Sequence, residues 1–295
     1  MNNIPLSYFY CWNRFPQDLV PMMMNEFAVN GAENLVITDT LSEAILKDPR
    51  QIASMIYNAK NAGLKWFEVH APFGECYDLN TRLSYRRAGM IADQSKIMQL
   101  AADMGCKTYV IHIGAWDCVF NHDVSLQQMR DLAMDSIDKL LPLAEKLQIV
   151  LAIENSFELS NSPDEVLYYL NRFDSPWIGC CFDVGHANYM APSKDGSPKA
   201  YTDYQRNKAW RGQLVQEPAA LEKLLPHIVT CHLHDNNGLT DGHELPGCGT
   251  VDWQEVMGKL KTAPRLLSYQ SEVSVAGGKV PVRTLCETMS KLVQA

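Results

Sequence analysis

The sequence predicts an α/β protein that folds as a single (β/α)8 TIM barrel spanning residues 1–295. Two observations predict it: eight short apolar segments rich in β-branched or aromatic residues, and longer segments with helical spacing between most of them. Strands that alternate with helices are parallel, and strands that are apolar almost throughout are buried on both faces. Eight such units can close into a barrel, whose C-terminal strand ends surround one mouth.

The expected strands follow one another along the whole chain. They are Ile4–Trp12, Asn34–Thr38, Lys65–His70, Thr108–Ile113, Ile149–Glu154, Trp177–Asp183, Ile228–His234 and Arg265–Val273. Helical spacing, mostly after polar or Pro-containing turns, predicts helices at Leu41–Ala62, Leu83–Met104, Leu126–Leu147 and Pro163–Phe173. The segment Met190–Gln213 is longer than a usual βα connection and follows the sixth strand, so we expect a functional loop above the mouth.

An open, doubly wound sheet is the alternative architecture. Such a sheet binds its ligand at one switch point between strands. In this chain, ligand-type side chains end six separate strands: His70, His112, Glu154, Asp183, His232 and Glu272. A barrel explains that distribution better, because all of its strand ends face one cavity.

Composition limits the classes of partner. The formal net charge of −8 gives no general attraction to nucleic acid or anionic membranes, although a local basic patch such as Arg82, Arg86 and Arg87 leaves nucleic acid open. Nine cysteines without a CxxC pair indicate reduced thiols rather than a cysteine-bound zinc. We expect a cytoplasmic protein, because the N-terminus lacks a basic leader and no run reaches the roughly 18 apolar residues that span a bilayer.

Five of the eight histidines stand at or just beyond strand ends, beside carboxylates that could share a metal ion with them. Imidazole nitrogens and carboxylate oxygens are ligands suited to zinc or manganese. The nine candidate metal ligands are His70, His112, Glu154, Asp183, His186, His232, Asp241, His243 and Glu272.

Each candidate ligand also has a plainer interpretation. Glu154 follows Ile-Val-Leu-Ala-Ile, where a carboxylate is costly to desolvate unless it binds a metal, pairs with an arginine or caps a helix. The same logic holds for Glu272. Asp183 could cap the next helix, and His70 and His112 could be core histidines.

The segment His232-Leu-His234-Asp235 alternates as a strand does, so His232 and His234 share a face and Asp235 points elsewhere. One of the two histidines is expected to coordinate a metal, and the other to orient a ligand or contact substrate.

Two further features complete the expected mouth. In Asp241-Gly242-His243 the glycine would let both flanking side chains bend onto one ion, and Pro246–Trp253 then indicates a tight turn that enters a helix. Trp116, just after the fourth strand, is a candidate substrate contact, because an aromatic wall suits a sugar ring.

The segments after the sixth and seventh strands carry a specific pattern. It comprises Phe-Asp-Val-Gly-His-Ala-Asn at 182–188, His-Leu-His-Asp-Asn-Asn-Gly at 232–238 and Asp-Gly-His-Glu-Leu-Pro-Gly-Cys-Gly-Thr-Val-Asp-Trp at 241–253. With this pattern, nearly the whole chain resembles the xylose-isomerase-like TIM-barrel superfamily, which contains endonuclease IV, ketose 3-epimerases and sugar-phosphate isomerase/epimerase relatives.

The resemblance implies one of two ligand arrangements. Endonuclease IV holds three zinc ions, and this chain matches every ligand: His70, His112 and Glu154 for the first ion, Glu154, Asp183, His232 and Glu272 for the second, and His186, Asp241 and His243 for the third. Ketose epimerases keep one ion on the second set and use its two glutamates to remove and return a proton. The residue that matches His186 contacts their substrate.

The chain departs from both relatives. The arginine that ketose epimerases place shortly after the metal histidine is missing from residues 232–241. The sequence characteristic of endonuclease IV is altered around Glu154 and after His186, and no DNA-intercalating loop is evident.

Three hypotheses follow. The first is a metal-dependent isomerase or epimerase of a small sugar or sugar phosphate, with His186, His234 and Trp116 contacting substrate and Glu154 and Glu272 as acid and base. The second is an endonuclease IV-like trinuclear zinc phosphoester hydrolase, acting on abasic-site DNA or as a small-molecule phosphatase. The third is a barrel that binds a sugar or metal without turnover. The cofactor is one to three zinc or manganese ions per chain, and the oligomeric state stays open, a homo-oligomer included.

Overall fold

The computed structural model describes residues 4–115, 123–193, 195, 197, 199–201, 214, 216–275 and 280–295. Eight parallel strands pair in chain order, and β8 pairs with β1, so the sheet closes into a barrel. The strands are β1 Leu6–Tyr8, β2 Asn34–Ile37, β3 Lys65–His70, β4 Thr108–Ile111, β5 Val150–Glu154, β6 Ile178–Asp183, β7 Ile228–Leu233 and β8 Ser268–Ser271. The predicted (β/α)8 barrel is confirmed.

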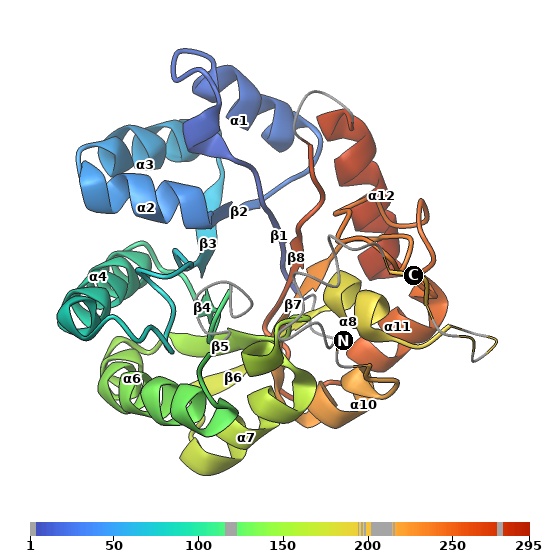
Figure 1. The fold of residues 1–295 in the computed structure, drawn as a ribbon. Helices are drawn as coiled ribbons and strands as arrows, with labels where there is room; N and C mark the ends of the chain where they lie inside the picture. The colour runs from blue at the N-terminus through green and yellow to red at the C-terminus, as the bar shows by residue number, and fades with distance from the viewer. Residues whose placement is uncertain are drawn as a thin grey trace.

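Helices surround the barrel, as Figure 1 shows, with the strands at the centre of the view. The α-helices are α1 Val20–Val29, α2 Asp39–Lys47, α3 Gln51–Asn61, α4 Ser84–Asp103, α6 Leu126–Leu147, α7 Pro163–Phe173, α8 Val184–Met190, α10 Ala220–Leu224, α11 Trp253–Leu260 and α12 Val282–Gln294. Short 3-10 helices are η1 Trp12–Arg14, η2 Leu159–Asn161 and η4 Leu225–His227. Helix α6 has the predicted bounds and begins with a capping box formed by Ser125 and Gln128.

The predicted helix Leu41–Ala62 is wrong as one element, because the chain forms α2 and α3 with a break between them. Pro49 lies in the break, and Asp48 before it is extended, with φ −142° and ψ 93°. Proline disfavours the helical conformation for the residue that precedes it, so α2 ends there.

The predicted first strand, Ile4–Trp12, is longer than β1. Its last residue begins η1, where the buried Trp12 indole packs against Phe27 with ring centroids 5.7 Å apart. Trp12 is thus a core residue, but it belongs to the layer between the barrel and the helices.

A polar layer lies inside the barrel, two residues before the end of β3. Glu68 is fully buried there, and its Oε1 accepts hydrogen bonds from the hydroxyls of Thr108 (2.9 Å), Thr230 (2.6 Å) and Ser268 (2.5 Å). These hydroxyls reach Glu68 from β4, β7 and β8, so the layer ties opposite walls of the barrel together. The strand ends beyond it form the mouth.

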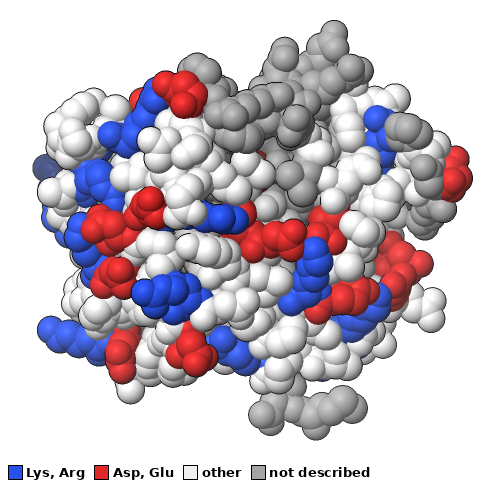
Figure 2. Space-filling view, turned by 60° about the horizontal axis from the view of Figure 1, so that its bottom comes forward, with Lys and Arg blue, Asp and Glu red and all other residues white. Residues whose placement is uncertain are grey.

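The surface and the helices bear on possible partners. On the face in Figure 2, Lys and Arg side chains are interspersed with Asp and Glu instead of gathering in one basic area. Within the part of the chain that the structure describes, every helix is too short or too polar to cross a bilayer. Most of the predicted loop Met190–Gln213, and Trp116, lie outside the described residues.

Candidate metal centre

The ends of five strands, β3 to β6 and β8, bring ligand-type side chains to one mouth. His70, Glu154 and Asp183 are the last residues of β3, β5 and β6. His112 follows β4 directly, and Glu272 follows β8 directly. All five are buried, because the side chains at a barrel mouth point toward its axis.

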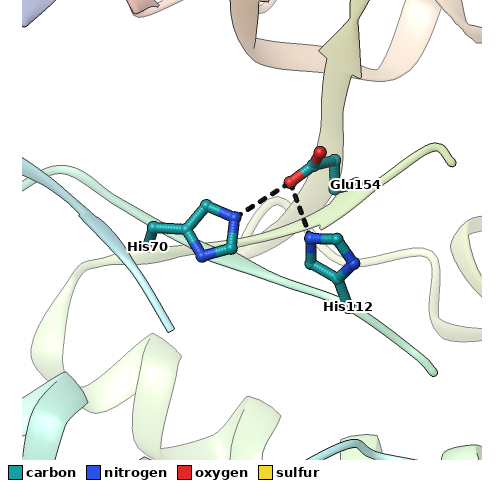
Figure 3. Close-up of side chains that lie close together, drawn as sticks. All are labelled: His70, His112 and Glu154. Atoms are coloured by element: carbon teal, nitrogen blue, oxygen red, sulfur yellow. Dashed lines mark hydrogen bonds and ion pairs between the residues drawn. The ribbon is translucent and has the colours of Figure 1, made fainter. Parts of the chain in front are cut away.

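The first group consists of His70, His112 and Glu154. The Nε2 atoms of both histidines point at one carboxylate oxygen, Glu154 Oε2, at 3.2 Å and 3.1 Å, as Figure 3 shows. His70 Nδ1 lies 2.9 Å from the carbonyl oxygen of Ala71. A carbonyl can only accept, so Nδ1 carries a proton and Nε2 is the ring nitrogen that faces the mouth.

The second group consists of Glu154, Asp183, His232 and Glu272, with one ligand atom from each within 4.8 Å of the others. His232 Nδ1 lies 3.0 Å from Glu272 Oε2 and 3.4 Å from both Glu154 Oε1 and Asp183 Oδ2. Among the residues that the structure describes, neither His232 Nδ1 nor Glu272 Oε2 has a hydrogen-bond partner, although both are buried. Donor atoms that are close but not aligned for hydrogen bonds are the arrangement a shared cation requires, and such a cation can neutralise the three buried carboxylates.

The third group consists of His186, Asp241 and His243. His186 Nδ1 donates to the carbonyl of Asn155, and His243 Nδ1 donates to the carbonyl of Glu272, each at 2.9 Å. Their Nε2 atoms therefore face the Asp241 carboxylate, at 3.5 Å and 3.4 Å, and a metal ion would take the place of a proton there. The residues fit a metal ion, with the orienting hydrogen bonds that ligating histidines make.

The backbone that presents the third group differs from the expectation for Gly242. The unusual conformation falls on His243, whose φ is +46°, while Gly242 does not adopt a positive φ. A non-glycine residue in this region is strained and persists only where surrounding contacts hold it. The hydrogen bond to the Glu272 carbonyl is one such contact.

Opposite charges dominate the mouth. Burial disfavours the charged form of Glu154, but His232 and His112 outweigh it and hold the pKa of Glu154 well below its usual value. Burial also opposes charge on His243, yet Asp241 raises the pKa of His243 to about 10. The carboxylates therefore stay ionised, and a divalent cation can replace the protons that the histidines hold.

Asp183 caps a helix and also stands in the second group. Its Oδ1 accepts a hydrogen bond of 2.6 Å from the backbone N–H of His186, so it caps α8. Its other oxygen, Oδ2, faces His232. Capping and membership of the second ligand group are compatible, because a carboxylate has two oxygens.

The predicted substrate contacts are not equally placed. His186 lines a cavity at the mouth of about 170 Å³. His234 is fully buried, is absent from that lining, and directs Nε2 at Asp183, so the geometry favours the orienting role over substrate contact. Trp116 lies outside the described residues.

Several site residues escaped the sequence analysis. Cys181 joins Glu154 and His232 in a further group of ligand-type atoms, and its position two residues before Asp183 on a strand was a usable signal. Phe73 stacks on His112 with ring centroids 5.1 Å apart. Phe157 and Glu158 also line the cavity, but they lie on a loop whose path no periodicity reveals.

The turn after β7 is held by Asp235, as its predicted outward direction allowed. Its carboxylate accepts hydrogen bonds from the indole of Trp253 and the backbone N–H groups of Gly247 and Val251. The predicted turn into a helix is confirmed, because α11 begins at Trp253. Asp235 thereby fixes the ends of the loop that carries Asp241 and His243.

A second cavity, of about 850 Å³, is larger than the mouth but lies between α8, α10 and α11. None of the nine candidate ligands lines it. The smaller cavity is the better candidate site, because the orphaned polar atoms and the perturbed carboxylates are there.

Comparison with known proteins assigns the family. The model of the xylose isomerase-like TIM barrel family matches residues 31–265, and the chain belongs to that family. An uncharacterized protein of Methanocaldococcus jannaschii is 26% identical over 213 residues, which are 70% of this chain and 62% of that relative. The chain thus spans less than two thirds of this relative's length.

Solved structures share the fold over almost the full chain. A D-tagatose 3-epimerase-like protein matches with a TM-score of 0.73 and 18% identity, covering 99% of this chain and 97% of its own. The 3-keto-D-glucoside 4-epimerase of E. coli matches with a TM-score of 0.70 and 15% identity, covering 99% of this chain and 100% of its own. The IolI protein with a bound zinc atom matches with a TM-score of 0.69 and 14% identity, covering 99% of this chain and 98% of its own.

Proposed function

We propose that this protein is a divalent-metal-dependent isomerase or epimerase of a small sugar, working by proton transfer at a carbon next to a carbonyl. The observation that carries the proposal is the second group, in which two glutamates from opposite parts of the barrel share one candidate cation site and also line the cavity. The sugar epimerases among the structures of the same fold support it.

The proposed roles follow from position. A cation bound by the second group would polarise the carbonyl and hydroxyl oxygens of a bound sugar. Glu154 ends β5, Glu272 directly follows β8, and both line the cavity, so they would flank a substrate carbon held in front of the group. One carboxylate removes a proton and the other returns it. His186, at the cavity wall, binds a substrate hydroxyl.

The cavity supports a small, unphosphorylated substrate. Its volume of about 170 Å³ lies below the roughly 300 Å³ or more of sites for drug-sized ligands. Two aromatic rings, Phe73 and Phe157, face it, and its described lining contains no Lys or Arg that would pair with a phosphate. The Glu158 carboxylate in the same lining would repel a phosphate.

The test is turnover of unphosphorylated ketoses and keto-sugars in deuterium oxide with zinc- or manganese-loaded protein. The proposal expects product that carries deuterium at the carbon whose configuration changes. For a variant such as Glu272→Gln, the matched control is Glu287→Gln, because Glu287 is exposed on α12, where it pairs with Arg283. Turnover without any deuterium uptake would show that the proton-transfer mechanism is wrong.

A second candidate, metal-assisted phosphoester hydrolysis, is favoured by the first and third groups. They place ligand-type atoms beside the second group, and a one-metal epimerase does not need them. Three tightly bound zinc ions together with cleavage of abasic-site DNA or of simple phosphoesters would support the hydrolase. One bound ion without such cleavage would reject it.

A further inference from the structure

We infer that His234 is a positioning residue that joins the second and third ligand groups, so that the third group holds its ion only while the His234 ring is in place. The inference rests on the proposed metal centre, and it is independent of the reaction performed there. His234 follows β7 directly and is fully buried.

One edge of the ring fixes the second group. His234 Nε2 lies 3.1 Å from Asp183 Oδ1 and 3.0 Å from Asp183 Oδ2. An ionised carboxylate only accepts, so Nε2 carries the proton and holds the Asp183 carboxylate in place. Asp183 is the N-cap of α8, so this hydrogen bond also fixes the start of the helix that carries His186.

One face of the ring fixes the third group. The imidazoles of His234 and His243 stack with centroids 4.0 Å apart and planes inclined by 11°. His243 is held on its edge by the Glu272 carbonyl and has the left-handed backbone described above. The stack fixes the plane of the His243 ring, and the hydrogen bond from Nδ1 to the Glu272 carbonyl turns Nε2 toward Asp241.

Gly185 makes this position available to a ring. A Cβ on Gly185 would lie 1.9 Å from Cε1 of His234, far inside contact distance. The glycine in Asp-Val-Gly-His, at the start of α8, therefore leaves the space that the His234 ring fills. An alanine there must displace the imidazole from both Asp183 and His243.

The experiment measures zinc affinity and stoichiometry by equilibrium dialysis of the full-length protein and elemental analysis. Asp241→Asn, which removes a third-group ligand, defines the contribution of the third ion. His234→Asn and Gly185→Ala are expected to lower the affinity for that ion by roughly 10- to 100-fold, the usual effect of removing a residue that orients a ligand. His227→Asn, in η4 and outside every ligand group, is the control with unchanged affinity.

A double variant separates positioning from general loosening. In the Asp241→Asn background, His234→Asn should cause no further loss at the third site, because the site is already abolished. His234→Phe keeps a ring against His243 but no donor for Asp183, so it should retain the third ion better than His234→Asn.

The outcomes are distinguishable. Unchanged third-ion affinity in His234→Asn or in Gly185→Ala overturns the inference, and if the His234 variants fail to fold, Gly185→Ala alone decides it. A parent protein that binds no zinc overturns the proposed metal centre instead. A parent protein that loses no zinc when Asp241 is changed to asparagine overturns the inference, because the third group then holds no ion. A thermal unfolding curve of each variant with chelator present shows whether the fold itself has changed.

Discussion

Glu154 Oε1 and His232 Nδ1 lie 3.4 Å apart at the barrel mouth, although β5 and β7 are not neighbouring strands. The contact exists because the sheet closes and its inward side chains meet at the axis. The other carboxylate oxygen of Glu154, Oε2, contacts His70 and His112. Glu154 is therefore the residue common to the first and second groups.

Metal binding should stabilise the protein. An ion that binds only the folded state at 100 times its dissociation constant adds about 2.7 kcal/mol to the free energy of unfolding. Zinc-loaded protein should therefore unfold at a higher temperature than chelated protein in a thermal scan. Asp183→Asn should lose most of this difference, and an unchanged melting temperature in the parent would contradict the prediction.

Glu272→Gln should reduce turnover by about 10²- to 10⁴-fold, the usual contribution of a general acid or base. The amide keeps the size of the side chain but cannot accept a proton. Steady-state kinetics on any sugar found to react, together with the zinc content of the variant, separate lost proton transfer from lost metal. Activity within twofold of the parent at full zinc content would remove Glu272 from the mechanism.

Zinc affinity should rise with pH. The pKa of His243 is raised from 6.5 to about 10, so the metal-free protein holds this proton at neutral pH and a zinc ion must displace it. The ion pair with Asp241 stabilises the metal-free protein fully below pH 6.5, and this contribution is lost as pH rises through about 10. Calorimetry in buffers of different ionisation enthalpy should detect proton release on zinc binding. Binding without proton release would contradict this.

Ser125→Ala should lower the free energy of unfolding by about 1 kcal/mol, the typical loss when a helix N-cap is removed. Ser125 Oγ accepts from the backbone N–H of Gln128, and Gln128 returns a contact to Ser125, so the variant uncaps α6. Denaturant titration measures the effect. Zinc content should not change, since α6 contributes none of the nine candidate ligands.

The strand ends could be predicted from the sequence because buried parallel strands are apolar and their polar terminators are conspicuous. Glu154 after Ile-Val-Leu-Ala-Ile and Asp183 after an apolar run are examples, and both end strands as expected. The convergence of distant residues then followed from the geometry of a closed barrel.

Features that depend on side-chain packing could not be predicted. The stack of His234 on His243 needs the space above Gly185 and a positive φ at His243, neither of which has a periodic signal. The stacking of Phe73 on His112 depends on the path of a loop. The break between α2 and α3 was readable from Pro49, but the apolar spacing continued across it.

Anomalous scattering at the zinc edge from crystals of zinc-loaded protein tests the central claim most directly. The account predicts a peak within bonding distance of Glu154, Asp183, His232 and Glu272 together, at roughly 2.0–2.2 Å from their ligand atoms. A fully loaded crystal without a peak among these four side chains would contradict it.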